Sequence, residues 1–145
     1  MIIVLDTNVV FSTIIKANGY MAKVFFSIPS FAEYYAPEFL VTELQLHQKK
    51  LLKISGLSPT NYELAKTSVF AQIKFVDINT IPDYFLKTAA TLTRDVDFKD
   101  FQFVALTLFL NGMLWTGDKK LYNGLRRKDF DRIVTTKEIS STFSL

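Results

Sequence analysis

Three aspartates fall at points of the chain where a buried strand is expected to end or a buried helix to begin. Asp6 directly follows an apolar run, Asp118 lies three residues after Trp115 at the end of another, and Asp100 opens an apolar helix. Each aspartate alone could simply cap a helix or stabilise a turn. Because ligands of open parallel sheets bind outside the carboxyl ends of the strands, the three together predict one acidic cleft.

The chemistry of such a cleft depends on what neutralises it. Carboxylates held close together repel one another unless a cation lies between them. The sequence has no cysteine, which excludes thiolate sites, and its one histidine, His47, argues against a zinc site. Oxygen ligands favour Mg²⁺ or Mn²⁺. A cluster of acids of this kind is typical of metal-assisted chemistry on phosphates.

The elements that must position these acids can be read from the apolar pattern. Short apolar runs predict strands at 2–5, 32–37, 74–78, 113–115 and 132–136. Helices are expected between them, at 8–16, 20–28, 38–54, 59–73, 82–93, 100–111 and 119–127, with a short one at the end. Strands that alternate with helices predict an α/β fold with a parallel sheet covered on both faces. We expect residues 1–5 to form the central strand.

Composition sets the outer limits. A chain of 145 residues with 49% hydrophobic and 21% charged residues predicts one folded domain rather than disorder. Its 14 phenylalanines indicate an aromatic core or an apolar surface for a partner. The net charge of +3 is compatible with nucleic acid. No apolar run reaches the roughly 18 residues of a membrane helix, and no signal peptide is expected, so the prediction is a cytoplasmic protein without a membrane partner.

Four segments together resemble a known family. "VLDTNVVFS", "FLVTELQLH", "DFQFVALTL" and "LWTGDKKL" are similar to motifs of the PIN-domain ribonucleases, which include the toxins of type II toxin–antitoxin pairs. The resemblance is strong over residues 2–12 and 97–121, moderate over 36–47 and weak over 55–93. It implies a single PIN-like domain over residues 1–145, built as a three-layer α/β/α sandwich with a central parallel sheet of four to five strands.

The resemblance also implies roles for particular residues. The acids that would be catalytic and bind Mg²⁺ or Mn²⁺ are Asp6, Glu43, Asp100 and Asp118. Glu33 and Glu38 lie near Glu43 in the chain and are its rivals, while Asp97 could replace or assist Asp100. Asn8 and Thr116 would support the site by orienting acids or water. His47, one turn after Glu43, is expected to be structural rather than a catalytic base.

The function implied is a metal-dependent endoribonuclease that leaves a 5′-phosphate and a 3′-hydroxyl, acting as the toxin of a type II pair. Its expected partners are RNA, an antitoxin protein and a second copy of the chain. The residues that could follow the RNA backbone, or merely form a solvated helix face, are Lys119, Lys120, Arg126, Arg127 and Lys128.

Two alternatives remain open. One is a catalytically silent PIN-fold module that binds RNA or protein. The other is an aspartyl phosphotransferase or phosphatase with Asp6 as the nucleophile. The haloacid-dehalogenase-like pattern has a second aspartate two positions later, where this chain has Asn8.

Overall fold

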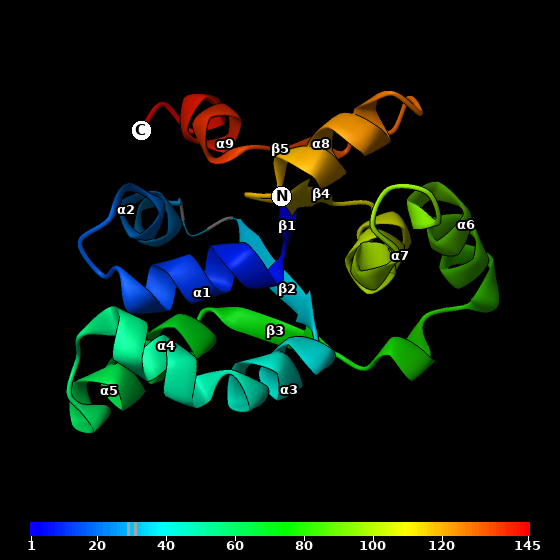
Figure 1. The fold of residues 1–145 in the computed structure, drawn as a ribbon. Coiled ribbons are helices and arrows are strands. Elements are labelled where there is room, and N and C mark those ends of the chain that lie inside the picture. The colour runs from blue at the N-terminus through cyan, green and yellow to red at the C-terminus, as the bar shows by residue number, and fades with distance from the viewer. Residues whose placement is uncertain (29, 31) are drawn as a thin grey trace.

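A five-stranded parallel sheet forms the centre of the computed structural model, which describes residues 1–28, 30 and 32–145 (Figure 1). The spatial order is β3-β2-β1-β4-β5, so the first strand is central, as predicted. The strands are β1 (Ile2–Leu5), β2 (Glu33–Pro37), β3 (Ile73–Val76), β4 (Met113–Trp115) and β5 (Ile133–Val134). Each neighbouring pair is parallel, which confirms the predicted α/β sheet.

The helices cover both faces of this sheet. Those before β3 are α1 (Thr7–Ile15), α2 (Tyr20–Ser27), α3 (Phe39–Leu46), α4 (Gln48–Ser55) and α5 (Pro59–Phe70). After β3 come η1 (Ile78–Thr80), α6 (Asp83–Thr93), η2 (Phe98–Asp100), α7 (Phe101–Leu110), α8 (Lys119–Arg126) and α9 (Thr136–Thr142). Helices α6 and α7 lie on the opposite side of the sheet from α1 and α2 (Figure 1). The predicted three-layer sandwich is therefore confirmed.

The direction of the chain explains these layers. From β1 the strands are added outward to β2 and β3, and the chain then returns past β1 to add β4 and β5. Since parallel crossovers are right-handed, reversing the direction of travel moves the connecting helices to the other face. The reversal creates a topological switch point between β1 and β4.

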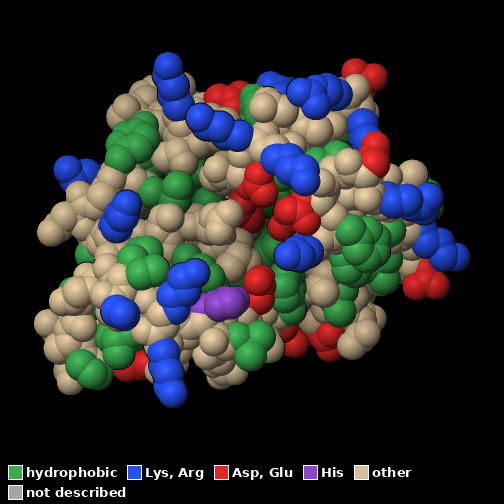
Figure 2. Space-filling view, viewed as in Figure 1, with side chains coloured by type: hydrophobic (Ala, Val, Ile, Leu, Met, Phe, Trp, Pro, Cys, Tyr) green, Lys and Arg blue, Asp and Glu red, His purple; other side chains and the backbone are tan. Residues whose placement is uncertain are grey.

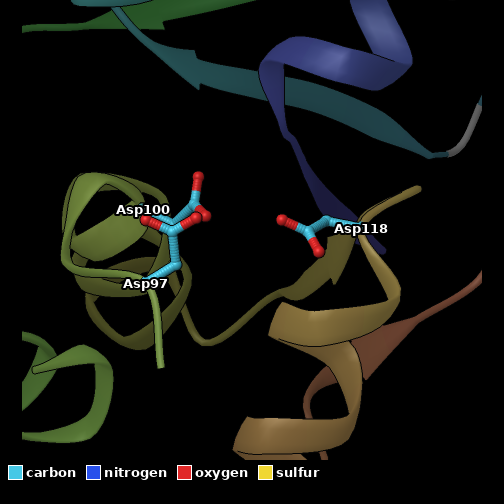
Figure 3. Close-up of side chains that lie close together, drawn as sticks. All are labelled: Asp97, Asp100 and Asp118. Carbon is cyan, nitrogen blue, oxygen red and sulfur yellow. The ribbon is translucent and has the colours of Figure 1, made fainter. Parts of the chain in front are cut away.

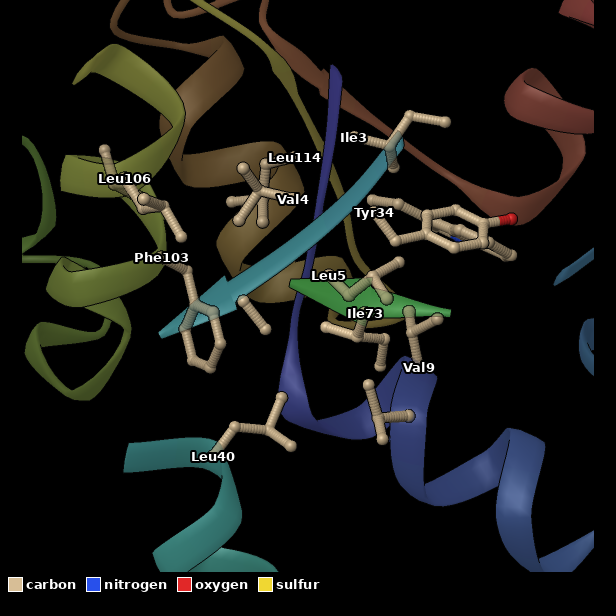
Figure 4. Packing of buried hydrophobic residues seen from close by; sticks show 14 of the residues in the cluster. Ile3, Val4, Leu5, Val9, Tyr34, Leu40, Ile73, Phe103, Leu106 and Leu114 are labelled. Carbon is tan, nitrogen blue, oxygen red and sulfur yellow. The ribbon is translucent and has the colours of Figure 1, made fainter. Parts of the chain in front are cut away.

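Strand β1 and helix α7 both contribute to one buried hydrophobic cluster (Figure 4). Ile3, Val4 and Leu5 are fully buried, as expected for a strand covered on both faces. Helix α7 packs against β1, β2, β4 and α6. Its residues 103–107 are all buried, which confirms the predicted buried helix. Phenylalanines serve both core and surface, since Phe103 is buried while Phe98 is 53% exposed.

Several predicted boundaries were wrong, for reasons that differ from one element to the next. The helix expected at 38–54 is two helices, and the chain bends at His47, whose backbone is not helical. The helix expected to reach residue 73 ends at Phe70, because Ile73 pairs in β3. The last strand stops at Val134, since Thr135 caps α9 through a reciprocal capping box with Glu138.

None of the helices formed by residues 1–28, 30 and 32–145 combines the length and the apolar character needed to span a membrane.

Candidate functional site

A cleft of about 600 Å³ opens at the carboxyl ends of β1 and β4, at the switch point of the sheet. Figure 2 shows acidic side chains gathered at the centre of this face, with basic side chains around them. The residues that line the cleft are Asp6, Thr7, Asn8, Phe11, Phe39, Glu43, His47, Asp97, Lys99, Asp100 and Asp118. All four acids singled out in the sequence therefore share one cleft with Asp97.

Asp6 is held at the end of β1 by the start of the next helix. It is the N-cap of α1, and its Oδ1 accepts a hydrogen bond of 2.8 Å from the backbone N–H of Val9. Its Oδ2 accepts a hydrogen bond from the Thr116 hydroxyl. The side chain is only 2% exposed, and burial raises its pKa to about 6 although these hydrogen bonds oppose the rise. Asp6 is thus both a helix cap and a wall of the cleft.

Thr116 joins the ends of the two central strands. Its buried hydroxyl donates to Asp6 and accepts the backbone N–H of Asp118 at 3.0 Å. Pairing of Leu5 with Trp115 puts the residues after β1 and β4 at the same level. The Asp118 Oδ1 then caps α8 by accepting the N–H groups of Lys120 at 2.9 Å and Leu121 at 3.1 Å.

Three carboxylates form the closest group in the cleft. Asp97, Asp100 and Asp118 each place one oxygen within 4.8 Å of the other two. Asp97 and Asp100 approach from η2 and the start of α7, and Asp118 faces them from the connection between β4 and α8 (Figure 3). Oxygen donors converging from separate elements are a suitable donor set for a divalent cation such as Mg²⁺ or Mn²⁺.

The pKa of Asp100 reflects the negative charge gathered in the cleft. Burial, and to a lesser degree the nearby carboxylates of Asp97, Asp6, Asp118 and Glu43, together raise its pKa to about 7. Although Asp100 is at the N-terminus of α7, its side chain makes no capping hydrogen bond in the described structure. The favourable helix dipole is therefore outweighed by burial and by like charges.

Glu43 lines the cleft from α3. Its Oε1 accepts a hydrogen bond of 2.8 Å from the hydroxyl of Thr7, the residue that follows Asp6 in the chain. The two other glutamates considered for this role, Glu33 and Glu38, do not belong to the described lining of the cleft. Glu33, on β2, forms an ion pair of 3.1 Å with Lys74, on β3, and Glu38 is exposed just before α3.

Asn8 is exposed and lines the cleft. Asp97, the rival of Asp100, also lines it and belongs to the closest acid group together with Asp100. His47 is exposed at the cleft rather than buried, with its ring edge-on to Phe11 at 6.4 Å. Sequence reasoning missed Thr7 and Lys99. Thr7 could have been found because it lies next to Asp6, whereas a lysine between two aspartates has no local signal.

The basic residues that follow Asp118 in the chain lie outside the described lining of this cleft. Lys119, Lys120 and Arg127 are exposed. Arg126 is 3.7 Å from Glu138 and lies over the Tyr122 ring, and Lys128 pairs with Asp95. Lys99 brings a positive charge to the cleft instead.

Comparisons with known proteins agree with this architecture. Residues 4–140 match the PIN domain family. A chain in the crystal structure of VapBC2 from Rickettsia felis bound to a DNA fragment from their promoter has a similar fold, with a TM-score of 0.65. The two chains are 14% identical over 93% of this chain and 97% of that one, a level that reports on the fold alone. No curated protein sequence matches this chain. Because the family match extends over nearly all of the chain, the protein belongs to the PIN domain family.

Proposed function

We propose that this protein is an endoribonuclease dependent on Mg²⁺ or Mn²⁺, which hydrolyses phosphodiester bonds of RNA. The observation that carries the proposal is the group of Asp97, Asp100 and Asp118 oxygens within 4.8 Å of one another, at the switch point of a PIN fold. PIN domains are generally nucleases that depend on divalent metals. The excess of carboxylates supports the same chemistry. A divalent ion held by these carboxylates would offset their negative charge and would also attract the phosphate of RNA.

In this proposal Asp6, Asp100 and Asp118 hold the main ion, and Asp97 assists Asp100. A divalent ion, when bound, lowers the pKa of water and neutralises charge on the phosphate. The chain itself supplies the orientation of these ligands. The Thr116 hydroxyl and the Val9 N–H each fix one oxygen of Asp6, and the N–H groups at the start of α8 fix one oxygen of Asp118.

Glu43 has a separate proposed role, as the group that positions the attacking water or helps to hold a second ion. Thr7 donates to its Oε1, so the second oxygen can accept a proton from water. The water oxygen forms a bond to phosphorus as the bond to the 3′-oxygen breaks, and that oxygen leaves as a 3′-hydroxyl once protonated. The other product has a 5′-phosphate. Lys99 would offset charge on the phosphate from the wall of the cleft.

The alternative with Asp6 as a nucleophile is disfavoured by the surroundings of that carboxylate. Asp6 is 2% exposed and both of its oxygens accept hydrogen bonds, from Val9 and from Thr116. A nucleophile needs a free oxygen directed at the phosphorus. An ion can still contact Asp6, because each hydrogen-bonded carboxylate oxygen keeps a second lone pair.

For its biological role we propose the toxin of a type II toxin–antitoxin pair, active in the cytoplasm as a homodimer and bound by an antitoxin. The support is the likeness of its motifs to such toxins and the similar fold in VapBC2. Co-expression with a small protein encoded beside it should yield a stable complex in which cleavage is inhibited. Sedimentation of the isolated chain tests the homodimer.

The decisive biochemical experiment is a cleavage assay of the purified protein on transfer, ribosomal and messenger RNA. Cleavage should require Mg²⁺ or Mn²⁺, stop with EDTA and resume when the metal is restored. RNA binding with no cleavage in either metal would instead favour the catalytically silent module.

A further inference from the structure

A second pocket of about 370 Å³ lies directly beside the acidic cleft. Sites for small organic groups span about 300–1,000 Å³, so this pocket is large enough for one flat ring system. It lies between the start of α2, the connection from β4 to α8, and the start of α9. Its walls include Tyr20, Met21, Gly117, Lys119, Tyr122 and Lys137.

The two cavities share one wall. Asp118 lines both of them, and Thr116, which lines the second pocket, donates its hydroxyl to Asp6 of the cleft. Gly117 lies between these residues and has no side chain, so the chain connecting β4 to α8 forms a thin partition. A ligand held at Asp118 in the cleft therefore needs only a short covalent reach to enter the pocket.

The pocket differs from the cleft in its chemistry. Tyr20 is 58% exposed, and the half-buried Tyr122 is held in place by Arg126, whose guanidinium lies over the ring at 5.3 Å. Its Nε also donates to the Tyr122 hydroxyl at 3.3 Å. Nucleobases stack on aromatic side chains of this kind. The exposed Lys119 and Lys137 add positive charge at the wall, which suits a flanking phosphate.

We propose that this pocket receives a base of the RNA substrate, from a nucleotide next to the phosphate cleaved at the acid cluster. Tyr20 and Tyr122 contact the base, and Lys119 and Lys137 attract the phosphates on either side. The proposal rests on the proposed ribonuclease function. It makes Tyr20 a residue that binds the base beside the cleavage point.

The first test measures cleavage of a short oligoribonucleotide cut at one site, beside analogues that lack one base on either side of that site. Tyr20→Ala should lower kcat/KM for the complete substrate by about 5- to 160-fold, the range that corresponds to loss of base–aromatic stacking. Tyr20→Phe keeps the ring and should retain the activity. On one of the abasic analogues the wild-type protein and Tyr20→Ala should be equally active.

Tyr84→Ala is the matched control, since Tyr84 is 72% exposed on α6 and lines neither cavity in the described structure. It should leave the kinetics of both substrates unchanged. The proposal is wrong if Tyr20→Ala matches the wild type on the complete substrate, or if its defect is equally large on both abasic analogues.

A second measurement needs no cleavage. The same oligoribonucleotide carrying 2-aminopurine beside the cleavage site is titrated with protein in EDTA, and stacking in the pocket should quench its fluorescence in the wild type and in Tyr20→Phe but not in Tyr20→Ala. Quenching that depends on Tyr20 without any cleavage would contradict the ribonuclease proposal and keep the base pocket. Cleavage that does not depend on Tyr20, together with quenching that does not depend on Tyr20, would support the ribonuclease proposal and contradict the base pocket. If Tyr20→Ala weakens only the binding of an antitoxin, the pocket belongs to a protein partner and the base proposal fails.

Discussion

The two ends of the parallel sheet carry hollows of similar volume but different chemistry. The carboxyl end opens into the cleft of about 600 Å³, with five acids in its lining. The amino end has a hollow of about 550 Å³, whose described lining contains one acid, Asp131, beside one base, Arg132. Both hollows lie at the ends of β1 and β4, so the choice of strands does not account for the difference.

What differs is the polarity of the chain at each end. At the carboxyl end Asp6 and Asp118 cap helices that start there, so two carboxylates are held toward one point. At the amino end Gly112 lies against β1, where an added Cβ would come within 2.8 Å of the Ile2 carbonyl oxygen. One end is built from close backbone packing, while the other gathers like charges that destabilise the protein unless a cation binds.

The largest expected effect is on catalysis at the carboxyl end. Asp118→Asn keeps the size of the side chain and should lower the cleavage rate by about 100-fold or more, as loss of a charged group at a reacting phosphate does. Asp131→Asn, at the amino end, should cleave at the wild-type rate. Circular dichroism should show the same fold in both. Equal loss in the two variants would remove the distinction between the ends.

Metal binding at the carboxyl end should stabilise the whole protein, and binding at the amino end is not expected. At a Mg²⁺ or Mn²⁺ concentration 100 times the dissociation constant, the free energy of unfolding should rise by about 2.7 kcal/mol. Urea unfolding of the wild type and of Asp131→Asn should show this increase, whereas Asp118→Ala should lose most of it. A full increase in Asp118→Ala would place the ion elsewhere.

The third prediction concerns how much the cleavage rate depends on the orientation of the Glu43 carboxylate. Thr7→Val removes the hydrogen bond to Oε1 and keeps the shape of the side chain, so cleavage should slow by about tenfold, the lower end of what the loss of an orienting partner costs at a metal site. Glu43→Gln should be slower still. An unchanged rate in Thr7→Val together with a slow Glu43→Gln would mean that the carboxylate is oriented by something other than Thr7.

The smallest expected effect concerns pH. The pKa of Asp100 is raised from 3.8 to about 7, so its contribution to stability is full below about pH 4 and is lost as the pH rises through 7. In EDTA the wild type should lose about 1 kcal/mol relative to Asp100→Asn between pH 5 and 8, a value reduced for solvent screening of this half-buried group. Parallel stability curves for the two proteins would contradict the crowding of acids in the cleft. Mg²⁺ should abolish the loss in the wild type.

Local pattern was sufficient for much of the fold. The apolar run before Asp6 reads as a strand buried on both faces, and β4 was predicted with the bounds that the structure has. Helix starts were predictable where a cap is encoded nearby, as at Ser58, which accepts the Asn61 N–H at 3.1 Å. The break at His47 was not predictable, because the residues on both sides continue a helical pattern.

The sequence by itself determined which acids follow strands and begin helices, because caps and apolar periods involve residues only a few positions apart. Tertiary structure alone decided that Asp97 joins Asp100 and Asp118, that Glu43 rather than Glu33 lines the cleft, and that Lys99 faces it. It also decided the second pocket, whose walls come from three distant segments. These features depend on contacts such as that between Thr116 and Asp6, 110 residues apart, which only the packed sheet brings together.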